Sequence, residues 1–253
     1  MTKLERKKKL LEIINEKKGA TVPELASILG VSPYTIRRYL NELSQEGLLK
    51  KVYGGATLNL GTGFEYSFHE KEQRNKESKL LIAKKAFELL KPGMIVLFDS
   101  STTVLFLVRM LKERNINIKV VTNSLPITRE LVNAENVEVF TLGGKLRRQN
   151  LSFVGYLTVK NLKEIKVDII FMGVTAINKD GIATVDMEEA ETNAYMLKTA
   201  NKRVILADET KIGRSSFFKV ADLSDIDMLI TTRFADLKQI KEIEEKNVKV
   251  ILA

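Results

Sequence analysis

Residues 76–253 alternate between short apolar segments and longer amphipathic segments, and this alternation constrains the fold more than any other feature of the sequence. The apolar segments have the length of strands, and most of the segments between them have helical spacing. Strands that alternate with helices form a mainly parallel sheet, so an α/β domain is predicted here. The expected strands are residues 94–98, 119–121, 138–142, 168–172, 203–207, 228–231 and 249–252.

Polar residues follow four of these strands at the point where each strand ends. The carboxyl ends of strands in an open parallel sheet lie along one edge, so the four loops are expected to converge on one crevice. Hydroxyls and backbone N–H groups at a helix start suit a phosphate, Lys211 or Arg147 can add charge, and Asp99 can accept hydrogen bonds from sugar hydroxyls. The candidate ligand-binding residues are Asp99, Ser100, Ser101, Thr102, Thr103, Thr122, Asn123, Ser124, Gly143, Gly144, Arg147, Asp208 and Lys211.

The same residue types also have a purely structural explanation. Ser, Thr and Asn are favoured as helix caps wherever a strand turns into a helix, so one such loop would be weak evidence for a ligand. Four loops in register favour a binding site. For Arg147 and Arg148, ligand contact and plain solvation are equally compatible with the sequence.

The first 57 residues have a different pattern, which predicts three short helices. Leucines and isoleucines at helical spacing form the first helix, which Gly19 closes. Thr21 and Glu24 have the spacing of a capping box, so a second helix of about two turns is expected from Thr21 to Gly30.

A third helix is expected to open at Ser32 and to end at Gly47. At about 100° per residue, its apolar residues Ile36, Leu40 and Leu43 fall in one narrow sector. The side chains opposite this sector are those of Tyr34, Arg37, Arg38, Asn41 and Gln45. Arg can donate two hydrogen bonds to a guanine edge, Asn and Gln can do the same to adenine, and all of them can hold phosphates.

The segment LLKKVYGGAT follows Gly47 and is typical of a short basic strand with a turn. Two helices joined by a short turn and followed by a hairpin form a winged helix-turn-helix, whose wing lies beside a DNA groove. The candidate DNA-binding residues are Ser32, Tyr34, Thr35, Arg37, Arg38, Asn41, Gln45, Lys50, Lys51 and Tyr53. The alternative is a small structural bundle whose arginines are merely solvated.

Charge and composition narrow the possible partners. The formal net charge is +9, and residues 1–58 hold 11 basic against 6 acidic side chains, which favours a polyanion at the N-terminal segment. The chain has no cysteine and one histidine, which argues against a zinc or haem site, and no cofactor is expected. Without an apolar leader or a long apolar run, a cytoplasmic protein with no membrane partner is expected.

Residues 58–75 contain glycines, hydroxyls and mixed charge without clear periodicity. They are expected to form a linker, extended over residues 64–68. The predicted organisation is a DNA-binding domain at 1–57, a linker at 58–75, and an α/β domain for effector binding and oligomerisation at 76–253.

Residues 1–57 resemble the DNA-binding half of the DeoR family of bacterial transcription regulators. Its signature contains an arginine in the first helix, followed by VS..TIRRDL..L...G.L.R..GGA. The matching residues here are Arg6, Val31, Ser32, Thr35, Ile36, Arg37, Arg38, Leu40, Leu43, Gly47, Leu49, Gly54, Gly55 and Ala56. The sequence departs at Tyr39, where the family usually has an acid. Because Tyr39 borders the core flank of the helix, this departure bears on a local salt bridge more than on DNA binding.

The second region resembles the sensor domain of the same family, which is similar in fold to ribose-5-phosphate isomerase. The matching residues are Asp99, Thr102, Thr103, Thr122, Asn123, Ser124, Gly143, Gly144, Arg147, Gly155, Asp168, Gly173, Gly181, Asp208 and Lys211. The resemblance implies a repressor of a sugar operon that binds operator DNA and a phosphorylated sugar or related metabolite as effector. A dimer or tetramer would place two recognition helices in successive major grooves, about 34 Å apart.

The main alternative is an active sugar-phosphate isomerase with a DNA-binding appendage. Such isomerases carry an acidic GADE segment after a strand, because the reaction needs a carboxylate base. Here the corresponding segment, residues 173–177, reads GVTAI, and Glu188, Glu189 and Glu191 fit a solvated helix start. Binding without turnover is therefore expected. A basic RNA- or membrane-associated protein is a further alternative, but the chain lacks stacking motifs and a lysine-lined apolar helix.

Overall fold

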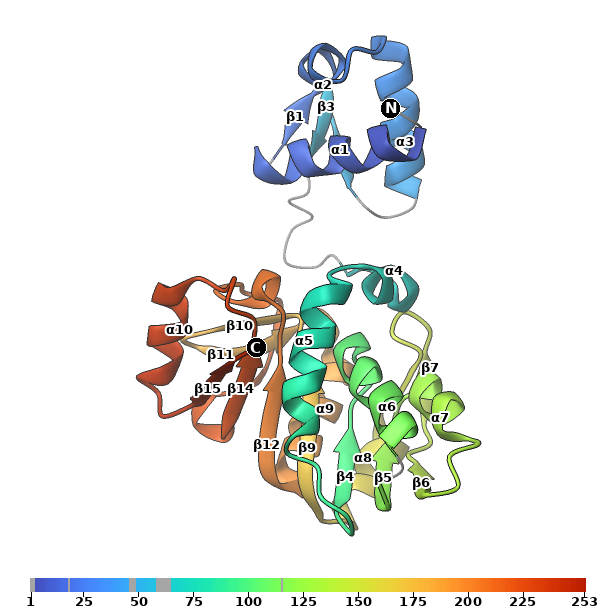
Figure 1. Ribbon diagram of the computed structural model, residues 1–253, viewed down its shortest axis with the longest axis vertical. Helices are drawn as coiled ribbons and strands as arrows, with labels where there is room; N and C mark the ends of the chain where they lie inside the picture. The colour runs from blue at the N-terminus through green and yellow to red at the C-terminus, as the bar shows by residue number, and fades with distance from the viewer. Residues whose placement is uncertain (1–2, 18, 46–48, 58–64, 115) are drawn as a thin grey trace. The chain divides into compact units, whose positions relative to one another are not determined.

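The computed structural model describes residues 3–17, 19–45, 49–57, 65–114 and 116–253. The chain forms two compact units, Met1–Tyr66 and Ser67–Ala253 (Figure 1). The buried apolar cluster of the first unit contains residues from Leu10 to Ala56, and two further clusters lie in the second unit. Each unit therefore has its own hydrophobic core.

The first unit has the helix order and the hairpin of a winged helix-turn-helix. Its elements are α1 (Lys3–Glu16), β1 (Ala20–Thr21), α2 (Val22–Leu29), α3 (Pro33–Gln45), β2 (Lys50–Val52) and β3 (Gly55–Thr57). The strands form an antiparallel sheet in the order β1-β3-β2, and the three helices share one core. A Cβ atom on Gly55 would overlap the Ala20 carbonyl, so the close approach of β3 to β1 requires glycine there.

Helix α2 begins and ends as the sequence predicts. The Thr21 side chain accepts a hydrogen bond from the Glu24 N–H, and the Glu24 carboxylate accepts one from the Thr21 N–H at 2.8 Å, so the capping box is confirmed. Gly30 ends the helix in the left-handed region, at φ 62°. These two caps fix the short turn that leads into α3. Gly47, expected to end α3, lies outside the described residues.

The second unit is built on a seven-stranded parallel sheet in the order β15-β14-β12-β9-β4-β5-β6. All seven strands expected from the sequence are present in it. Their bounds are β4 (Ile95–Phe98), β5 (Ile118–Thr122), β6 (Val137–Thr141), β9 (Val167–Gly173), β12 (Ala200–Leu206), β14 (Met228–Thr231) and β15 (Lys249–Leu252).

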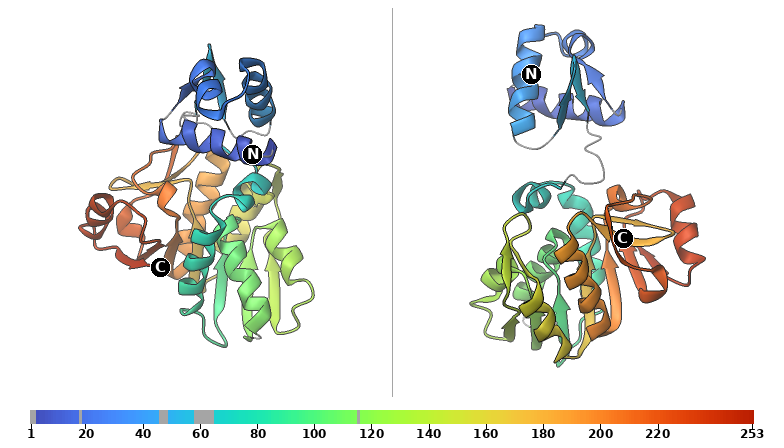
Figure 2. Two further views of the ribbon diagram at one scale, coloured as in Figure 1. Left: turned by 45° about the horizontal axis from the view of Figure 1, so that its top comes forward. Right: turned by 180° about the vertical axis from the view of Figure 1, so that it is seen from behind.

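Helices cover both faces of this sheet (Figures 1 and 2). Ile169 and Phe171 of β9 pack in one apolar cluster, and Ile170 and Met172 pack in the other, because successive side chains of a strand point to opposite faces. The first cluster includes residues of α5 (Lys76–Phe87), α6 (Thr102–Arg114) and α7 (Leu125–Leu131). The second includes residues of α8 (Tyr156–Lys163), α9 (Met187–Thr199) and α10 (Leu237–Glu244).

Two smaller sheets in this unit have no counterpart among the strands expected from the sequence. One is the hairpin of β7 (Lys145–Arg147) and β8 (Ser152–Val154), and the other is antiparallel, in the order β10-β11-β13. The latter strands are β10 (Ala176–Asn178), β11 (Gly181–Thr184) and β13 (Phe218–Ala221). The hairpin continues the loop after β6, at the edge of the sheet where the polar loops were expected.

The expected linker is wrong over its last part. Ser67 caps a further helix, α4 (Phe68–Gln73), through a capping box with Glu70, and Phe68 is only 3% exposed in the core of the second unit. The unit boundary falls between Tyr66 and Ser67, so residues 67–75 belong to the sheet unit. The short capped helix has one apolar anchor, which is why periodicity did not predict it. Residues 58–64 lie outside the described part of the chain.

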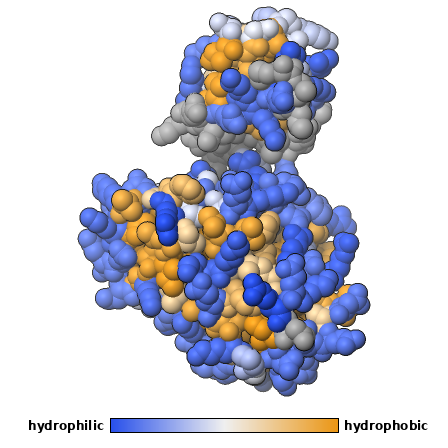
Figure 3. Space-filling model, in the orientation of Figure 1, coloured by the Kyte–Doolittle hydropathy of each residue, from blue (hydrophilic) through white to orange (hydrophobic). Residues whose placement is uncertain are grey.

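The face shown in Figure 3 is largely hydrophilic, but hydrophobic residues gather over α5 and over β14 and β15. Exposed apolar side chains of these elements include Leu80 and Leu81 of α5 and Leu252 of β15.

Candidate nucleic-acid interface and effector site

Helix α3 has the two faces that the sequence predicts. The Ser32 hydroxyl accepts a hydrogen bond from the Thr35 N–H at 3.2 Å and so caps the helix. Its apolar residues are buried in the core of the first unit, and the opposite face is exposed. The exposed polar side chains are those of Tyr34, Arg37, Arg38 and Asn41. The side chain of Gln45 lies outside the described residues.

Glu42 joins α3 to α1 and lies beside Arg38. Its carboxylate is 2.8 Å from Lys7 Nζ, 3.0 Å from Lys3 Nζ and 3.9 Å from Arg38 Nε. Hydrogen bonds from Lys7 and Lys3 hold the pKa of Glu42 below its usual value. Tyr39 is buried in the core, as expected, and its ring lies 5.6 Å from the Arg38 guanidinium carbon. The DeoR signature has an acid at the position of Tyr39. In this chain Glu42 provides a carboxylate beside Arg38 instead.

The hairpin of β2 and β3 lies against α3. Lys51 Nζ donates a hydrogen bond to Asn41 Oδ1 at 2.6 Å, so a residue of the wing contacts a residue of the exposed face of α3. Tyr53 is fully exposed at the turn, next to Gly54, whose φ of 75° favours glycine. The Lys50 side chain lies outside the described residues. The helix face and the wing therefore form one basic surface.

In the second unit, Asp99 follows β4 and is buried at the carboxyl edge of the sheet. Its carboxylate accepts hydrogen bonds from the Ser101 N–H and the Gly173 N–H, each at 2.9 Å. Burial raises the pKa of Asp99 to about 7, and these hydrogen bonds oppose the rise. A Cβ atom on Gly173 would overlap the Ser101 side chain, so glycine at the end of β9 allows the approach. Asp99 is thus held in place before any ligand arrives.

The other polar residues after β4 lie at the start of α6. The Ser101 hydroxyl accepts a hydrogen bond from the Val104 N–H at 3.2 Å, which makes it a cap of that helix. Ser100, Thr102 and Thr103 are buried beside it. These residues therefore lie at the same sheet edge as Asp99, as the sequence predicts.

Thr122, the last residue of β5, and the two residues after it have structural roles in the observed fold. The Thr122 hydroxyl accepts a hydrogen bond from the Ser124 N–H at 3.1 Å, and the Ser124 hydroxyl accepts one from the Ile127 N–H at 3.3 Å. Asn123 Nδ2 donates to the Phe153 carbonyl at 2.9 Å. Asn123 Oδ1 is buried and accepts no hydrogen bond from the described residues. Ser124 thus caps α7 and Thr122 holds the turn before this cap, whereas Asn123 keeps a buried acceptor that no described residue uses.

Gly143 and Gly144 connect β6 to the β7–β8 hairpin. The Gly143 carbonyl accepts a hydrogen bond from Thr158 Oγ1 at 2.8 Å. A Cβ atom on Gly144 would overlap the same Thr158 hydroxyl. The two glycines therefore let the hairpin pack against the start of α8.

Arg147 lies on β7 and pairs with two carboxylates at the start of α9. Its guanidinium is 3.3 Å from Asp186 Oδ2 and 3.4 Å from Glu189 Oε2. Asn150 Nδ2 donates to Glu189 Oε1 at 2.8 Å. The expectation that Glu188, Glu189 and Glu191 all form a solvated helix start is wrong for Glu189, which is only 9% exposed, because the first turn of α9 faces the hairpin.

Positive charges gather around Asp208 at the end of β12. Asp208 Oδ1 accepts a hydrogen bond from the Thr210 N–H at 3.0 Å and caps the short turn that contains Lys211. Burial lowers the pKa of Lys211, and Asp208 partly opposes this effect. Lys79 of α5 is 4% exposed, and burial lowers its pKa to about 8. Lys71 and Arg74 lie close enough to lower the pKa of both lysines further.

Lys79 is a candidate site residue that the sequence-based prediction missed. It lies in register with Ile82, Ala83 and Ala86, the buried apolar face of α5. A lysine that begins an apolar stripe with the spacing i, i+3, i+4, i+7 indicates a buried charge. Such a charge needs a polar or charged partner, so this pattern could have pointed to a site.

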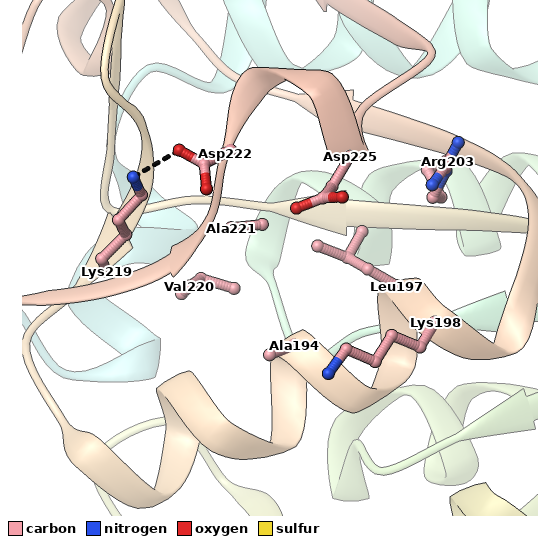
Figure 4. Close-up of a pocket in the computed structure, with 9 residues that line it drawn as sticks. All are labelled: Ala194, Leu197, Lys198, Arg203, Lys219, Val220, Ala221, Asp222 and Asp225. Carbon is pink, nitrogen blue, oxygen red and sulfur yellow. Dashed lines mark hydrogen bonds and ion pairs between the residues drawn. The ribbon is translucent and has the colours of Figure 1, made fainter.

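A shallow pocket of about 360 Å³ lies elsewhere in the second unit, between α9, β12 and β13 (Figure 4). Its lining includes Leu197, Arg203 and Val220, and none of the candidate site residues is among its lining residues. Lys219 and Asp222 form an ion pair at one side of it. The pocket is therefore distinct from the polar edge of the sheet.

Among the described helices, none has both the length and the apolar composition needed to cross a membrane.

Comparisons with known proteins agree with both units. The DeoR-like helix-turn-helix domain matches residues 6–61, and the DeoR C terminal sensor domain matches residues 74–233. The HTH-type transcriptional regulator GlpR of Haloferax volcanii is 36% identical over 99% of this chain and 98% of its own length. The lactose phosphotransferase system repressor of Staphylococcus aureus is 31% identical over 91% of this chain and 92% of its own length. The regulator GolR of Listeria innocua is 31% identical over the full length of both.

Solved structures similar to part of the chain include ribose-5-phosphate isomerase A of Methanocaldococcus jannaschii. The TM-score is 0.38 at 22% identity, over 54% of each chain. This similarity is a fold relation and carries no inference about activity. The relatives that match nearly the whole chain are named as transcription regulators or repressors, so the chain is a regulator and not an enzyme. With both of its domains matched, this chain belongs to the DeoR family of DNA-binding transcription regulators.

Proposed function

We propose that this chain is a repressor of a sugar-metabolism operon that releases its operator when a phosphorylated sugar binds to the second unit. The observation that carries the effector part is the group of cations around Asp208. Lys79 is buried and Lys211 is half-buried, and both lie close to Lys71 and Arg74. Buried positive charge on this scale favours a dianion such as a phosphate monoester.

The proposed sugar contacts lie at the same edge of the sheet. Asp99 can accept hydrogen bonds from sugar hydroxyls, and Asn123 Oδ1 is a buried acceptor without a partner among the described groups. Residues 100–103 and 143–144 would form the walls of the crevice around them. Arg147 acts in this proposal through Glu189, since its guanidinium already pairs with that carboxylate.

The proposed DNA contacts are the exposed residues of α3 and of the wing. Arg37, Arg38 and Asn41 would reach base edges or phosphates in the major groove, with Tyr34, Thr35 and Ser32 near the backbone. Lys51 and Tyr53 would contact the DNA backbone beside the groove, and Gln45 and Lys50 complete the proposed set.

Repression of a sugar operon is supported by the relatives, one of which is named as the repressor of a lactose phosphotransferase system. Self-association through the second unit is also part of the proposal. Exposed apolar residues over α5 and β15, among them Leu80, Leu81 and Leu252, offer a surface for a second copy of the chain. Light scattering after gel filtration would give the mass, and a monomer at micromolar concentration would contradict this part.

Binding to a labelled fragment from upstream of the protein's own gene tests the function directly. Fluorescence anisotropy should report specific binding that unlabelled random DNA does not compete away, and one member of a sugar-phosphate panel should weaken it. The matching unphosphorylated sugar is the control and should have no effect. Binding that is blind to sequence would contradict operator recognition, and indifference to every phosphate would contradict the effector assignment.

A further inference from the structure

Helix α4 is the first element of the second unit, directly after the residues that lead from the DNA-binding unit. It is short, and one apolar side chain, Phe68, anchors it in the core. Its remaining attachments are polar: Glu72 forms an ion pair with Arg109 of α6 at 2.6 Å, and the others come from the β7–β8 hairpin and from Lys79 of the candidate effector site. The way α4 docks is therefore sensitive to what happens at that site.

The first attachment comes from the loop of the β7–β8 hairpin. The Phe68 N–H donates to the Gln149 carbonyl at 2.8 Å, and Lys71 Nζ donates to Asn150 Oδ1. Asn150 in turn donates to Glu189, which pairs with Arg147. This chain of contacts joins α4 to the start of α9.

The second attachment comes from Lys79. Its Nζ donates to the backbone carbonyl of Lys71 and, at 2.8 Å, to that of Arg74. These carbonyls lie at the C-terminal end of α4, where a cation is favourable. The buried ammonium of Lys79 thus caps α4 from the neighbouring helix α5.

The surroundings of Lys79 make this cap responsive to an anion. The Asp208 carboxylate favours its charge, whereas Lys211, Lys71 and Arg74 oppose it, and burial is the largest effect. An entering phosphate would offer Lys79 a charged acceptor, and the Coulomb attraction between ammonium and phosphate is one that a neutral carbonyl does not supply. Binding of the anion therefore competes with the capping of α4.

We propose that Lys79 transmits the occupancy of the effector site to α4: an anion bound beside Asp208 and Lys211 draws the Lys79 ammonium away from the α4 carbonyls and loosens the docking of α4. This inference rests on the proposed function, in which that site binds a phosphorylated ligand. It adds that effector binding changes the docking of α4, the first element of the second unit. The ligand has differential affinity for the two states because it gains a cation only when α4 gives it up.

Hydrogen exchange of the full-length protein tests the coupling without any need for the operator. The probes are inorganic phosphate and glucose 6-phosphate, and calorimetry reports in parallel whether each one binds. On binding, peptides that cover residues 68–74 should exchange about tenfold faster, because the cap is weakened. Peptides that cover α7, which shares no hydrogen bond with Lys79 in the described part of the chain, should exchange at an unchanged rate.

A matched pair of variants on α5 assigns the effect to Lys79. In Lys79→Gln, residues 68–74 should exchange faster already without phosphate, and phosphate should no longer change the rate. Lys84→Gln removes the same charge from an exposed position of the same helix and should behave as the wild type. If Lys79→Gln does not fold, the wild-type comparison with and without phosphate still decides the question.

The outcomes separate this inference from the function on which it rests. If a phosphate binds by calorimetry while exchange at residues 68–74 is unchanged, the coupling is overturned and the effector site stands. If neither phosphate nor any sugar phosphate binds, the effector assignment fails and the coupling fails with it. If Lys84→Gln abolishes the response as Lys79→Gln does, the assignment to Lys79 is wrong.

Discussion

The residues proposed to meet DNA and those proposed to meet the effector are held in opposite ways. In the first unit, Arg37, Arg38 and Tyr53 extend into solvent from a small core. In the second unit, Asp99 and Lys79 are buried and hydrogen-bonded to backbone groups before any ligand is present. A long polyanion is contacted by side chains that reach outward, whereas a small anion is enclosed by groups already in place. DNA binding should therefore weaken when a charged side chain is removed. Anion binding by the second unit should also depend on the protonation state of its buried groups, and so on pH.

Core truncations should have the largest effect and should separate the two units. Ile36 in α3 and Phe171 in β9 are both fully buried. Ile36→Ala should lower the free energy of unfolding of the first unit by about 2 to 5 kcal/mol, and Phe171→Ala that of the second by about 3 to 5 kcal/mol. Calorimetry should show each variant shifting a different transition. A single transition that both variants shift equally would contradict two independently stabilised units.

Removal of one arginine from α3 should have the next largest effect, and only on DNA binding. Arg37→Ala or Arg38→Ala should weaken operator binding by about 1 to 3 kcal/mol, if that side chain makes a good base contact. Arg129→Ala, an exposed arginine of α7, is the charge-matched control and should leave binding nearly unchanged. Operator affinity that survives both α3 substitutions would show that the exposed face of α3 is not the reading face.

The pH dependence of anion binding should show that the sensor responds to ionisation. With the pKa of Lys79 at about 8, the free protein loses that proton as the pH rises above 8. An anion prefers the protonated lysine, so the contribution of Lys79 to affinity should be nearly level from pH 7 to 8 and then fall by up to about tenfold per pH unit. Asp208, Lys211, Lys71 and Arg74 also act on this group, so titration of Lys211 would steepen the fall.

Calorimetric titrations with glucose 6-phosphate at several pH values would measure this profile. Lys79→Gln should bind more weakly at pH 7, and the decline above pH 8 should be smaller. A wild-type affinity that does not change up to pH 9.5 would contradict a binding role for the Lys79 charge.

The smallest effect is expected for a helix cap in the second unit. Ser124→Ala should lower stability by about 1 kcal/mol, because the Ile127 N–H loses its acceptor at the start of α7. Ser124→Gly should cost only a few tenths of that, since glycine is tolerated at this position. Thermal unfolding would measure both variants. A Ser124→Ala variant as stable as the wild type would show that the hydroxyl does not act as a cap.

The sequence was sufficient to predict the seven strands and the two faces of α3. Strands buried on both faces are continuous apolar runs, and an amphipathic helix with a capped start has a clear period. The β10-β11-β13 sheet could not be predicted in this way. Its strands are short, and Ile182 pairs with Ala221, far away along the chain, so only the tertiary structure defines it.

The candidate site was predicted in outline but not in its electrostatics. Loops after parallel strands must share an edge, which correctly groups Asp99 with the residues around it. The sequence could not tell that Arg147 pairs with Glu189, because the hairpin that joins them was not predicted. Lys79 could have been found, since a lysine in an apolar helical stripe is unusual.

The topology of the sheet also determines the order in which the chain can fold during synthesis. The first unit is made of contacts among its first 57 residues, so it can form while the rest of the chain is still being translated. The sheet cannot form this early, because Val96 of β4 pairs with Ile169 of β9. The other edge of β9 pairs with β12, which is synthesised later still. Such non-local pairing is slow. Each nascent chain therefore presents a complete DNA-binding unit well before the sensor that is proposed to control it has folded.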